Sequence, residues 1–306
     1  MKYLPFLSGK YSTAPGLTAI EKTTDPLEKF IFQIDDSYKQ YIENKQDCRK
    51  ENIYKYYCKH DLYPETISCV NKYIVDELLL EYPLHFTFTQ NSNSYSLFNK
   101  LKNETITWED DWETLTNNAY ISLFDALCCQ VQEDIAVVQQ KEQTDWLAAI
   151  HLCAPNHWSP VEKSGKTFAT IHARIPGMDK TMHQHPKMLS AIIQKGPFTR
   201  FAWGIATDER LNHHPFAPPG VSSSYWHGRL NHQSQFYIRT ERQNLVGFDE
   251  QNAFLFTIRT YFYDVDTLTL IEKEALWQAI KSMSHETLIY KGMDKMKDKI
   301  EQRLFN

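Results

Sequence analysis

Five short runs of apolar or alternating residues in the second half of the chain limit its fold more than any other feature. They cover residues 146–153, 167–175, 198–205, 235–245 and 253–263, and turn-forming residues separate them. Runs of this length and pattern are typical of strands that follow one another through short connections. We therefore expect an antiparallel sheet that is built mainly from residues 146–263.

Helical patterns surround this region on both sides. Helices are expected over most of 30–82, over 119–130 and 182–194, and from 269 to the carboxyl end, where Thr269 and Glu272 form a capping box. Residues 87–118 are polar and rich in Asn, Thr and Trp, so we expect loops there. The fold class that follows is α+β.

We expect one domain rather than two. A length of 306 residues permits either arrangement, but no internal repeat or low-complexity segment interrupts the chain. The predicted domain spans residues 25–292. An amino-terminal arm precedes it at residues 1–24, and a carboxyl-terminal helix follows it at residues 293–306.

The composition argues against several function classes. The 10 glycines form no G-x-G motif and the six cysteines form no C-x-x-C pair, so neither a dinucleotide loop nor a plant-type iron–sulfur loop is encoded. A net charge of -5 argues against nucleic-acid binding. No apolar run is long enough to cross a membrane, and the expected location is the cytosol.

Most of the 12 histidines lie between His151 and His232, within the region that we expect to form the sheet. On a strand over 167–175, alternation would place Phe168, Thr170 and His172 on one face. If that face meets the core, His172 is presented into an aromatic-lined cavity. Histidine is a common ligand of haem iron and of other metals.

Arginines occur in apolar runs of the expected sheet, which is unusual because a buried guanidinium needs an anionic partner. Arg200 and Arg259 are two of them. A third strand carries Arg239 and Glu241 on one face and sends Arg242 to the other. These side chains form either a pocket that polarises a ligand or a structural Arg–Glu ladder across neighbouring strands.

A metal site without haem has weaker support. His183 and His185 form an H-x-H pair, and His213 and His214 are adjacent. Pro186 and Pro215 follow these pairs, which suggests loops, and no third ligand is evident.

Nine short motifs, taken in chain order, resemble the alpha subunit of haem-dependent oxidative N-demethylase and its relatives. They are Ile34 to Tyr38 with Lys45, Tyr82-Pro83, Val131 to Asp134, Cys153 to Trp158, Gly165 to Pro176, Arg200 with Trp203, Arg239 to Leu245, Phe256 to Tyr261, and Tyr290 to Gly292. The motifs span about residues 30–292, and their order makes a chance match improbable.

The resemblance implies a PAS-like antiparallel sheet with helical extensions at both ends, packed around a cavity that holds haem b. It also implies a monooxygenase that uses O2 to convert a small secondary amine to a primary amine and formaldehyde. Electrons would come from NADPH through a separate reductase that carries flavin and an iron–sulfur cluster. The absence of glycine and cysteine motifs agrees with this division of labour.

The resemblance also implies roles for individual residues. His172 would be the proximal iron ligand, and Arg200, Arg259 and Arg242 would bind the cofactor. Glu241 and Arg239 would act on the substrate as catalytic groups.

Departures from the family pattern leave alternatives open. The motif P-S-x-W reads Pro155-Asn156-His157-Trp158 in this chain, so His157 competes with His172 for the metal. The other functions to consider are a haem-based gas or redox sensor and a relative that has lost catalysis.

Overall fold

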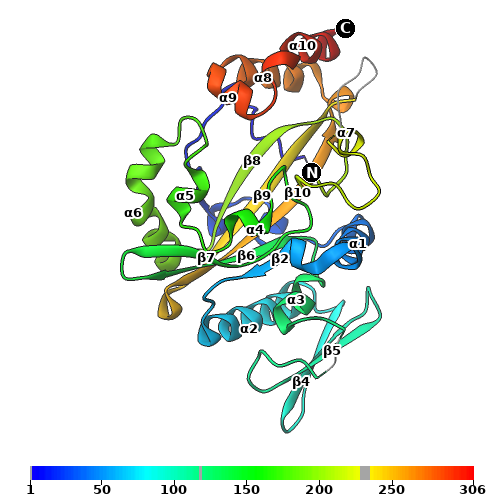
Figure 1. The fold of residues 1–306 in the computed structure, drawn as a ribbon, viewed down its shortest axis with the longest axis vertical. Coiled ribbons are helices and arrows are strands. Elements are labelled where there is room, and N and C mark those ends of the chain that lie inside the picture. The colour runs from blue at the N-terminus through cyan, green and yellow to red at the C-terminus, as the bar shows by residue number, and fades with distance from the viewer. Residues whose placement is uncertain (1, 117–118, 228–234) are drawn as a thin grey trace.

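A seven-stranded antiparallel sheet runs through the centre of the molecule (Figure 1). The computed structural model describes residues 2–116, 119–227 and 235–306. The strand order is β1-β8-β9-β10-β6-β7-β2. The strands are β1 (Thr18–Ala19), β2 (Tyr57–Lys59), β6 (Asp134–Lys141), β7 (Thr144–His151), β8 (Phe198–Ala206), β9 (Tyr237–Phe248) and β10 (Ala253–Asp264).

Helices pack on this sheet and also lie at both ends of the molecule (Figure 1). Those before the sheet's long strands are α1 (Tyr38–Tyr56), α2 (Pro64–Glu81) and α3 (Leu123–Cys128). Between β7 and β9 lie α4 (Pro160–Lys163), α5 (Phe168–His172), α6 (Asp179–Lys195) and α7 (Ser223–Trp226). The chain ends with α8 (Leu270–Lys281), α9 (His285–Tyr290) and α10 (Lys297–Phe305). The expected combination of helices with an antiparallel sheet is confirmed. No helix within the described residues has the length and apolar content to cross a membrane.

Four of the five expected strands are present as β7, β8, β9 and β10, but the strand expected over residues 167–175 is wrong. Phe168–His172 form the short helix α5 instead. The Thr167 side chain caps this helix by accepting a hydrogen bond from the Thr170 amide, and the Asp145 carboxylate accepts one from the Phe168 amide. Phe168, Ile171 and His172 therefore share a helical face rather than alternating across a sheet.

The loops expected over residues 87–118 are also wrong. This region forms a separate three-stranded antiparallel sheet of β3 (Phe86–Gln90), β4 (Ser94–Asn99) and β5 (Glu104–Glu109). Leu97 and Trp108 are fully buried, so alternating residues in these polar strands supply an apolar face. The small sheet lies at the end of the molecule beyond α2 and α3 (Figure 1).

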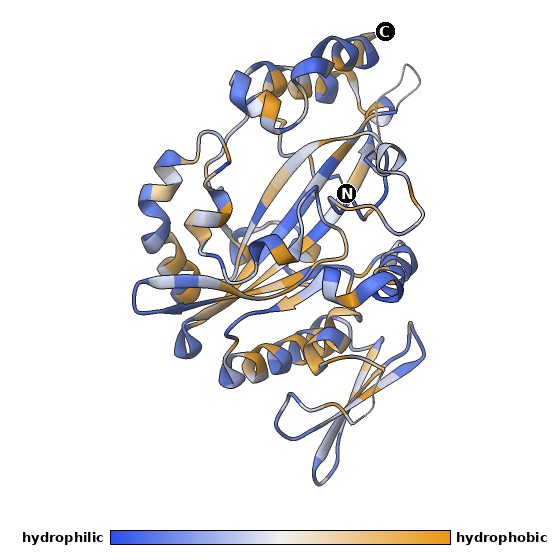
Figure 2. Cartoon of the chain, viewed as in Figure 1, coloured by the Kyte–Doolittle hydropathy of each residue, from blue (hydrophilic) through white to orange (hydrophobic). Residues whose placement is uncertain are grey.

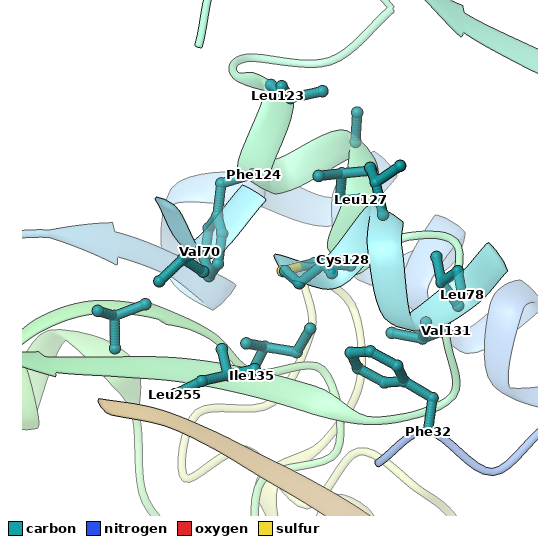
Figure 3. Close-up of a cluster of buried hydrophobic side chains, with 14 of the residues drawn as sticks. Phe32, Val70, Leu78, Leu123, Phe124, Leu127, Cys128, Val131, Ile135 and Leu255 are labelled. Carbon is teal, nitrogen blue, oxygen red and sulfur yellow. The ribbon is translucent and has the colours of Figure 1, made fainter. Parts of the chain in front are cut away.

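The largest hydrophobic cluster joins α2 and α3 to one face of the central sheet (Figure 3). Val70 and Leu78 of α2 and Leu127 of α3 face Ile135 of β6 and Leu255 of β10 in this cluster. Hydrophobic residues are concentrated where these helices meet the sheet (Figure 2). A second cluster packs α8 and α10 against Trp203 and Ile238, so this face is covered at both ends.

Strand register assigns the remaining side chains to two faces of the sheet. Arg200 pairs with Gln243, Ala202 with Glu241, and Gly204 with Arg239. Directly paired residues of an antiparallel sheet lie on the same face, and we name this side the site face. Arg242 and Arg259 are paired with one another on the other side, which we name the helix face because α2, α3, α8 and α10 pack on it.

Candidate functional site

The site face carries three of the expected functional residues side by side. Arg200 on β8 and Arg239 and Glu241 on β9 lie on it, as strand alternation predicts for the last two. Helix α6 packs on β9 and β10, where Ile192 and Ile193 contact Leu245. This packing covers one end of the site face. The part around Arg200, Glu241 and Gly204 is not covered by α6.

Two glycines show where the site face is closed and where it has space. A Cβ atom added to Gly247 would lie 2.0 Å from the Ile193 carbonyl oxygen, because the backbone of α6 lies directly on β9 there. A Cβ atom added to Gly204 would meet no atom of the described residues within 4 Å. Ala202, which is partly buried, precedes it on the same face. Within the described part of the chain, β8 therefore borders open space at Gly204.

His172 lies at the carboxyl end of α5, not on a strand, and its ring is fixed by two contacts. Nδ1 is 2.8 Å from the Phe168 carbonyl oxygen, and the ring stacks on Phe168 with centroids 4.1 Å apart. A carbonyl only accepts, so Nδ1 carries the proton and Nε2 keeps its lone pair. Burial lowers the pKa of His172 to about 4, and Arg200 is one of the nearby cations that favour the neutral ring.

Arg200 is a cation with little support from the protein. Burial lowers its pKa, and Glu241 is the main nearby anion that offsets this effect. Its buried Nε atom has no hydrogen-bond partner, and Arg200 donates no hydrogen bond to any residue that the structure describes. Such a group is suited to binding an anion that enters from outside the chain.

Arg239 is buried and held from several sides. It donates to the Ala154 carbonyl at 2.6 Å through Nη2 and to the Leu211 carbonyl at 3.4 Å through Nη1. Nη2 also lies 3.5 Å from Glu241 Oε1. The second oxygen of Glu241 accepts a hydrogen bond from Gln243 at 2.9 Å. Glu241 is only partly buried, so its carboxylate remains accessible.

Lys291, which follows α9, approaches the site from the edge of β8. Its Nζ atom donates to the Trp203 carbonyl at 2.7 Å and lies 5.1 Å from the Tyr11 ring centroid. Burial lowers the pKa of Lys291 to about 8, and Glu241 opposes this effect. The sequence pointed to Lys291 only as part of the motif Tyr290 to Gly292.

His157, the alternative iron ligand, lies near Arg239 rather than near α5. Its ring centroid is 5.4 Å from that of His213, and its backbone has a positive φ of 61°. Burial lowers the pKa of His157 to about 4, with further contributions from His213 and Arg239. A third histidine, His227, has its ring centroid 6.5 Å from that of His157.

Arg242 and Arg259 lie on the helix face, away from the site. Arg242 donates to the carbonyls of Glu28 and Phe30 at 2.6 and 2.8 Å. Arg259 binds Asp35 at 3.0 Å and lies 3.7 Å above the Tyr41 ring. Both guanidinium groups thus connect the sheet to the amino-terminal segment.

The histidine pairs that suggested a metal site without haem are separated in the structure. His183 and His185 lie within α6, which contains Pro186. The helix expected over 182–194 is therefore confirmed, and the loop that Pro186 suggested beside His185 is wrong. His213 and His214 are both buried in a loop. His213 binds Asp208 through Nε2 at 2.8 Å, a contact that no motif in the sequence predicts.

Another group of potential metal ligands surrounds His151 of β7. One member, Asp134, pairs with Ile258, which pairs with Gln243, so Asp134 lies on the site face. Asp125, Cys129 and His151 form one set, and Asp134, His151 and Cys153 form a second. Arg49 binds both carboxylate oxygens of Asp125, and Lys45 donates to the Glu133 carbonyl beside Asp134. Both oxygens of Asp134 accept from backbone amides, of Cys153 at 2.8 Å and of Ala154 at 2.7 Å. Carboxylates whose oxygens already have partners are poor metal ligands, so the group is better explained as a buried hydrogen-bond network.

A comparison with protein families identifies one whose sequence model covers nearly the whole chain. The description of this family is "HODM_asu-like: Haem-dependent oxidative N-demethylase, alpha subunit-like", and the match spans residues 22–301. The matched range includes every residue of the site face that is described above.

Proposed function

Because the chain belongs to the family of haem-dependent oxidative N-demethylase alpha subunits and their relatives, we propose that it binds haem and removes a methyl group from a small secondary amine. The family description supports haem dependence and oxidative chemistry. The amine, the haem type and the source of electrons are parts of the proposal.

We place the haem on the site face, within a PAS-like arrangement of five strands and three helices. The order of the long strands, β8-β9-β10-β6-β7, supports this assignment. So does the position of α4, α5 and α6, which follow β7 and precede β8 in the chain. A large planar ligand would lie on the part of the site face that α6 leaves uncovered. This part includes the space above Gly204 and the partly buried Ala202.

The observation that carries the proposal is the state of His172. A proximal histidine must be neutral, with one ring nitrogen free for iron and the other fixed by a hydrogen bond to a backbone carbonyl or carboxylate. His172 meets both requirements, because Nδ1 binds the Phe168 carbonyl and burial keeps the ring neutral above about pH 4. Nε2 would hold haem iron.

Arg200 would bind a haem propionate. A propionate supplies the anion that this buried guanidinium lacks in the described chain, and guanidinium–carboxylate pairs are among the stronger hydrogen-bonded contacts. Arg242 and Arg259 were also expected to bind the cofactor, but their positions on the helix face do not support that role. We therefore leave them out of the proposed site.

Glu241 would bind the amine. Its carboxylate faces the same space as Arg200 and Ala202, and a carboxylate accepts hydrogen bonds from an ammonium or amine nitrogen. Arg239 beside it would hold the carboxylate in place. Haem, when bound, supplies the centre at which dioxygen is activated.

The overall reaction consumes the amine, one O2, two electrons and two protons, and yields the demethylated amine, formaldehyde and water. The chain carries no dinucleotide or iron–sulfur motif, so a partner must deliver the electrons. The family description refers to an alpha subunit, which supports a partner subunit. We propose a reductase that uses NADPH and contains flavin and an iron–sulfur cluster.

The test is amine-dependent formaldehyde release by the haem-loaded chain, with dimethylamine as the probe and a ferredoxin reductase system with NADPH as the electron source. Glu241→Gln should lower kcat/KM by about 10-fold or more, mainly through a higher KM, because it removes the charge that binds the amine. The matched control is Glu250→Gln, at an exposed position, which should leave turnover unchanged. A haem-loaded chain that releases no formaldehyde with any small methylamine would overturn the enzyme proposal and favour a sensor.

A further inference from the structure

A continuous chain of polar contacts connects the protein surface to Glu241. Asp208 lies 2.8 Å from His213 Nε2, His213 Nδ1 lies 3.3 Å from Arg239 Nη1, and Arg239 Nη2 lies 3.5 Å from Glu241. The Asp208 side chain is 30% exposed, whereas those of His213 and Arg239 are 5% and 2% exposed. The contacts therefore run from solvent to the site face through the interior.

The donors and acceptors of this chain fix the tautomer of His213. Arginine can only donate, so Nδ1 of His213 must accept from Arg239. Nε2 then carries the proton and donates it to Asp208. A doubly protonated His213 would turn a second N–H group toward Arg239 and lose this contact.

The groups around His213 favour its neutral form. Burial lowers the pKa of His213, and Arg239 and Arg210 add to this effect, while Asp208 opposes it. His157 faces it from the segment after β7, and β10 contributes the apolar ring of Phe262. Burial would raise the pKa of Asp208, but hydrogen bonds from His213 and Arg210 lower it below its usual range.

The backbone on both sides of His213 is also fixed. Its amide donates to the Pro155 carbonyl at 3.1 Å, and its carbonyl accepts from the His157 amide at 2.9 Å. Asn212 beside it donates to the Tyr56 hydroxyl at 2.8 Å. The imidazole thus comes from a rigid loop, as a group that orients another side chain must.

We propose that His213, oriented by Asp208, is a positioning residue that holds the Arg239 guanidinium against Glu241. The proposal deepens the proposed function, since it names residues that prepare Glu241 for the amine. Neither side chain of the Asp208–His213 pair touches Glu241, so their effect on the substrate passes through Arg239.

Three substitutions at His213 separate its two hydrogen bonds. In His213→Asn the side-chain oxygen falls near the position of Nδ1, so it can still accept from Arg239 although the contact with Asp208 is lost. His213→Gln places its amide near Nε2 and can reach Asp208, but it removes the Nδ1 acceptor of Arg239 Nη1, which then keeps only the long contact with the Leu211 carbonyl. His213→Ala removes both contacts. His214→Asn is the control, because the neighbouring His214 ring accepts a hydrogen bond from the Phe216 amide and contacts the Tyr56 ring, but forms no hydrogen bond with Arg239 or Asp208.

The first measurement uses the chain without haem and does not depend on turnover. The guanidinium NMR signals of ¹⁵N-arginine-labelled protein, with Arg239 identified through Arg239→Lys, report whether the side chain is held in one position. We expect sharp, shifted Arg239 signals in the original chain, in His213→Asn and in the control. In His213→Gln and His213→Ala the signals should move to the positions of a mobile arginine. Unchanged signals in His213→Gln would overturn the proposal.

The second measurement uses the haem-loaded chain and dimethylamine. His213→Gln should raise KM by about 5-fold or more, while His213→Asn should restore it to within about 2-fold, because of the two hydrogen bonds of His213 only the one at Nδ1 reaches Arg239. Equal KM values for all four variants would overturn the proposal. If the original chain has no turnover, the proposed function fails on its own, and the NMR signals still decide whether His213 positions Arg239.

Discussion

Arg259 on the helix face and Arg200 on the site face of the central sheet have different surroundings. On the helix face, Arg259 binds Asp35 and Ser37 at 3.0 Å each and lies over the Tyr41 ring. On the site face, Arg200 donates no hydrogen bond to any described residue. A buried cation with protein partners stabilises the fold, whereas one without them is available to a ligand.

The neighbours of these arginines differ in the same way. On β8, the residues that face the helices include Trp203, which packs in the core with α8. Ala202 and Gly204 alternate with it on the site face, and a Cβ atom added to Gly204 would meet no atom of the described residues within 4 Å. One strand thus supplies packing on one side and room for a ligand on the other, which strand alternation makes possible.

The largest expected difference between the faces is in stability. Arg259→Met should lower the free energy of unfolding by about 3–5 kcal/mol, because it leaves buried Glu133 without its main cation. Arg200→Met should change it by about 1 kcal/mol or less, since no hydrogen bond within the described chain is lost. Guanidinium chloride unfolding of the haem-free chains measures both. Equal losses would contradict the comparison.

A second difference concerns the two glycines of the site face. Gly247→Ala should destabilise the chain by about 3 kcal/mol, because its Cβ would lie within 2.0 Å of the α6 backbone. Gly204→Ala should stabilise it by about 0.5 kcal/mol, since its Cβ meets no atom of the described residues and alanine suits a strand better than glycine. Thermal unfolding of the two variants measures the effects. A destabilising Gly204→Ala would show that the space above β8 is filled.

The two faces should also respond to pH in opposite directions. Burial lowers the pKa of His172 from 6.5 to about 4, so the stability linked to it is present above about pH 6.5 and is lost as the pH falls to 4. Burial raises the pKa of Glu81 from 4.5 to about 8, so its contribution is present below about pH 4.5 and is lost as the pH rises through 8.

Each effect should be about 1–3 kcal/mol, measured as the free energy of unfolding between pH 4 and 9. His172→Phe should flatten the acid side of the curve, and Glu81→Gln should flatten the alkaline side. The assignment of the two groups would be wrong if Glu81→Gln changed only the acid side.

Much of the sheet could be predicted from the sequence because four of its strands have clear two-residue alternation. The segment around His172 could not, because Phe168, Ile171 and His172 fit a helical turn as well as an apolar strand. The helix is favoured by two hydrogen bonds at its amino end, one to the Thr167 side chain and one to Asp145. The strands β3 to β5 were missed because most of their residues are polar. Their few apolar residues alternate with polar ones, so that Leu97 and Trp108 lie on one buried face.

The site was predictable where it depended on neighbours along one strand. Alternation placed Arg239 and Glu241 together, as the structure confirms. The position of Arg200 beside them depends on the register between β8 and β9, which a single sequence does not contain. Asp208 and His213 reach Arg239 from a loop, so their contacts arise only from the tertiary fold.

The most direct test of the account is haem binding by the original chain, His172→Ala and His157→Ala, followed through the Soret absorption band during titration with haemin. His185→Ala is a control for the loss of a histidine beside Phe168. We predict a 1:1 complex with a ligated-haem spectrum for the original chain, His157→Ala and His185→Ala, and no stable complex for His172→Ala. An unchanged spectrum in His172→Ala, with loss of the complex in His157→Ala, would contradict the central claim that His172 holds the iron.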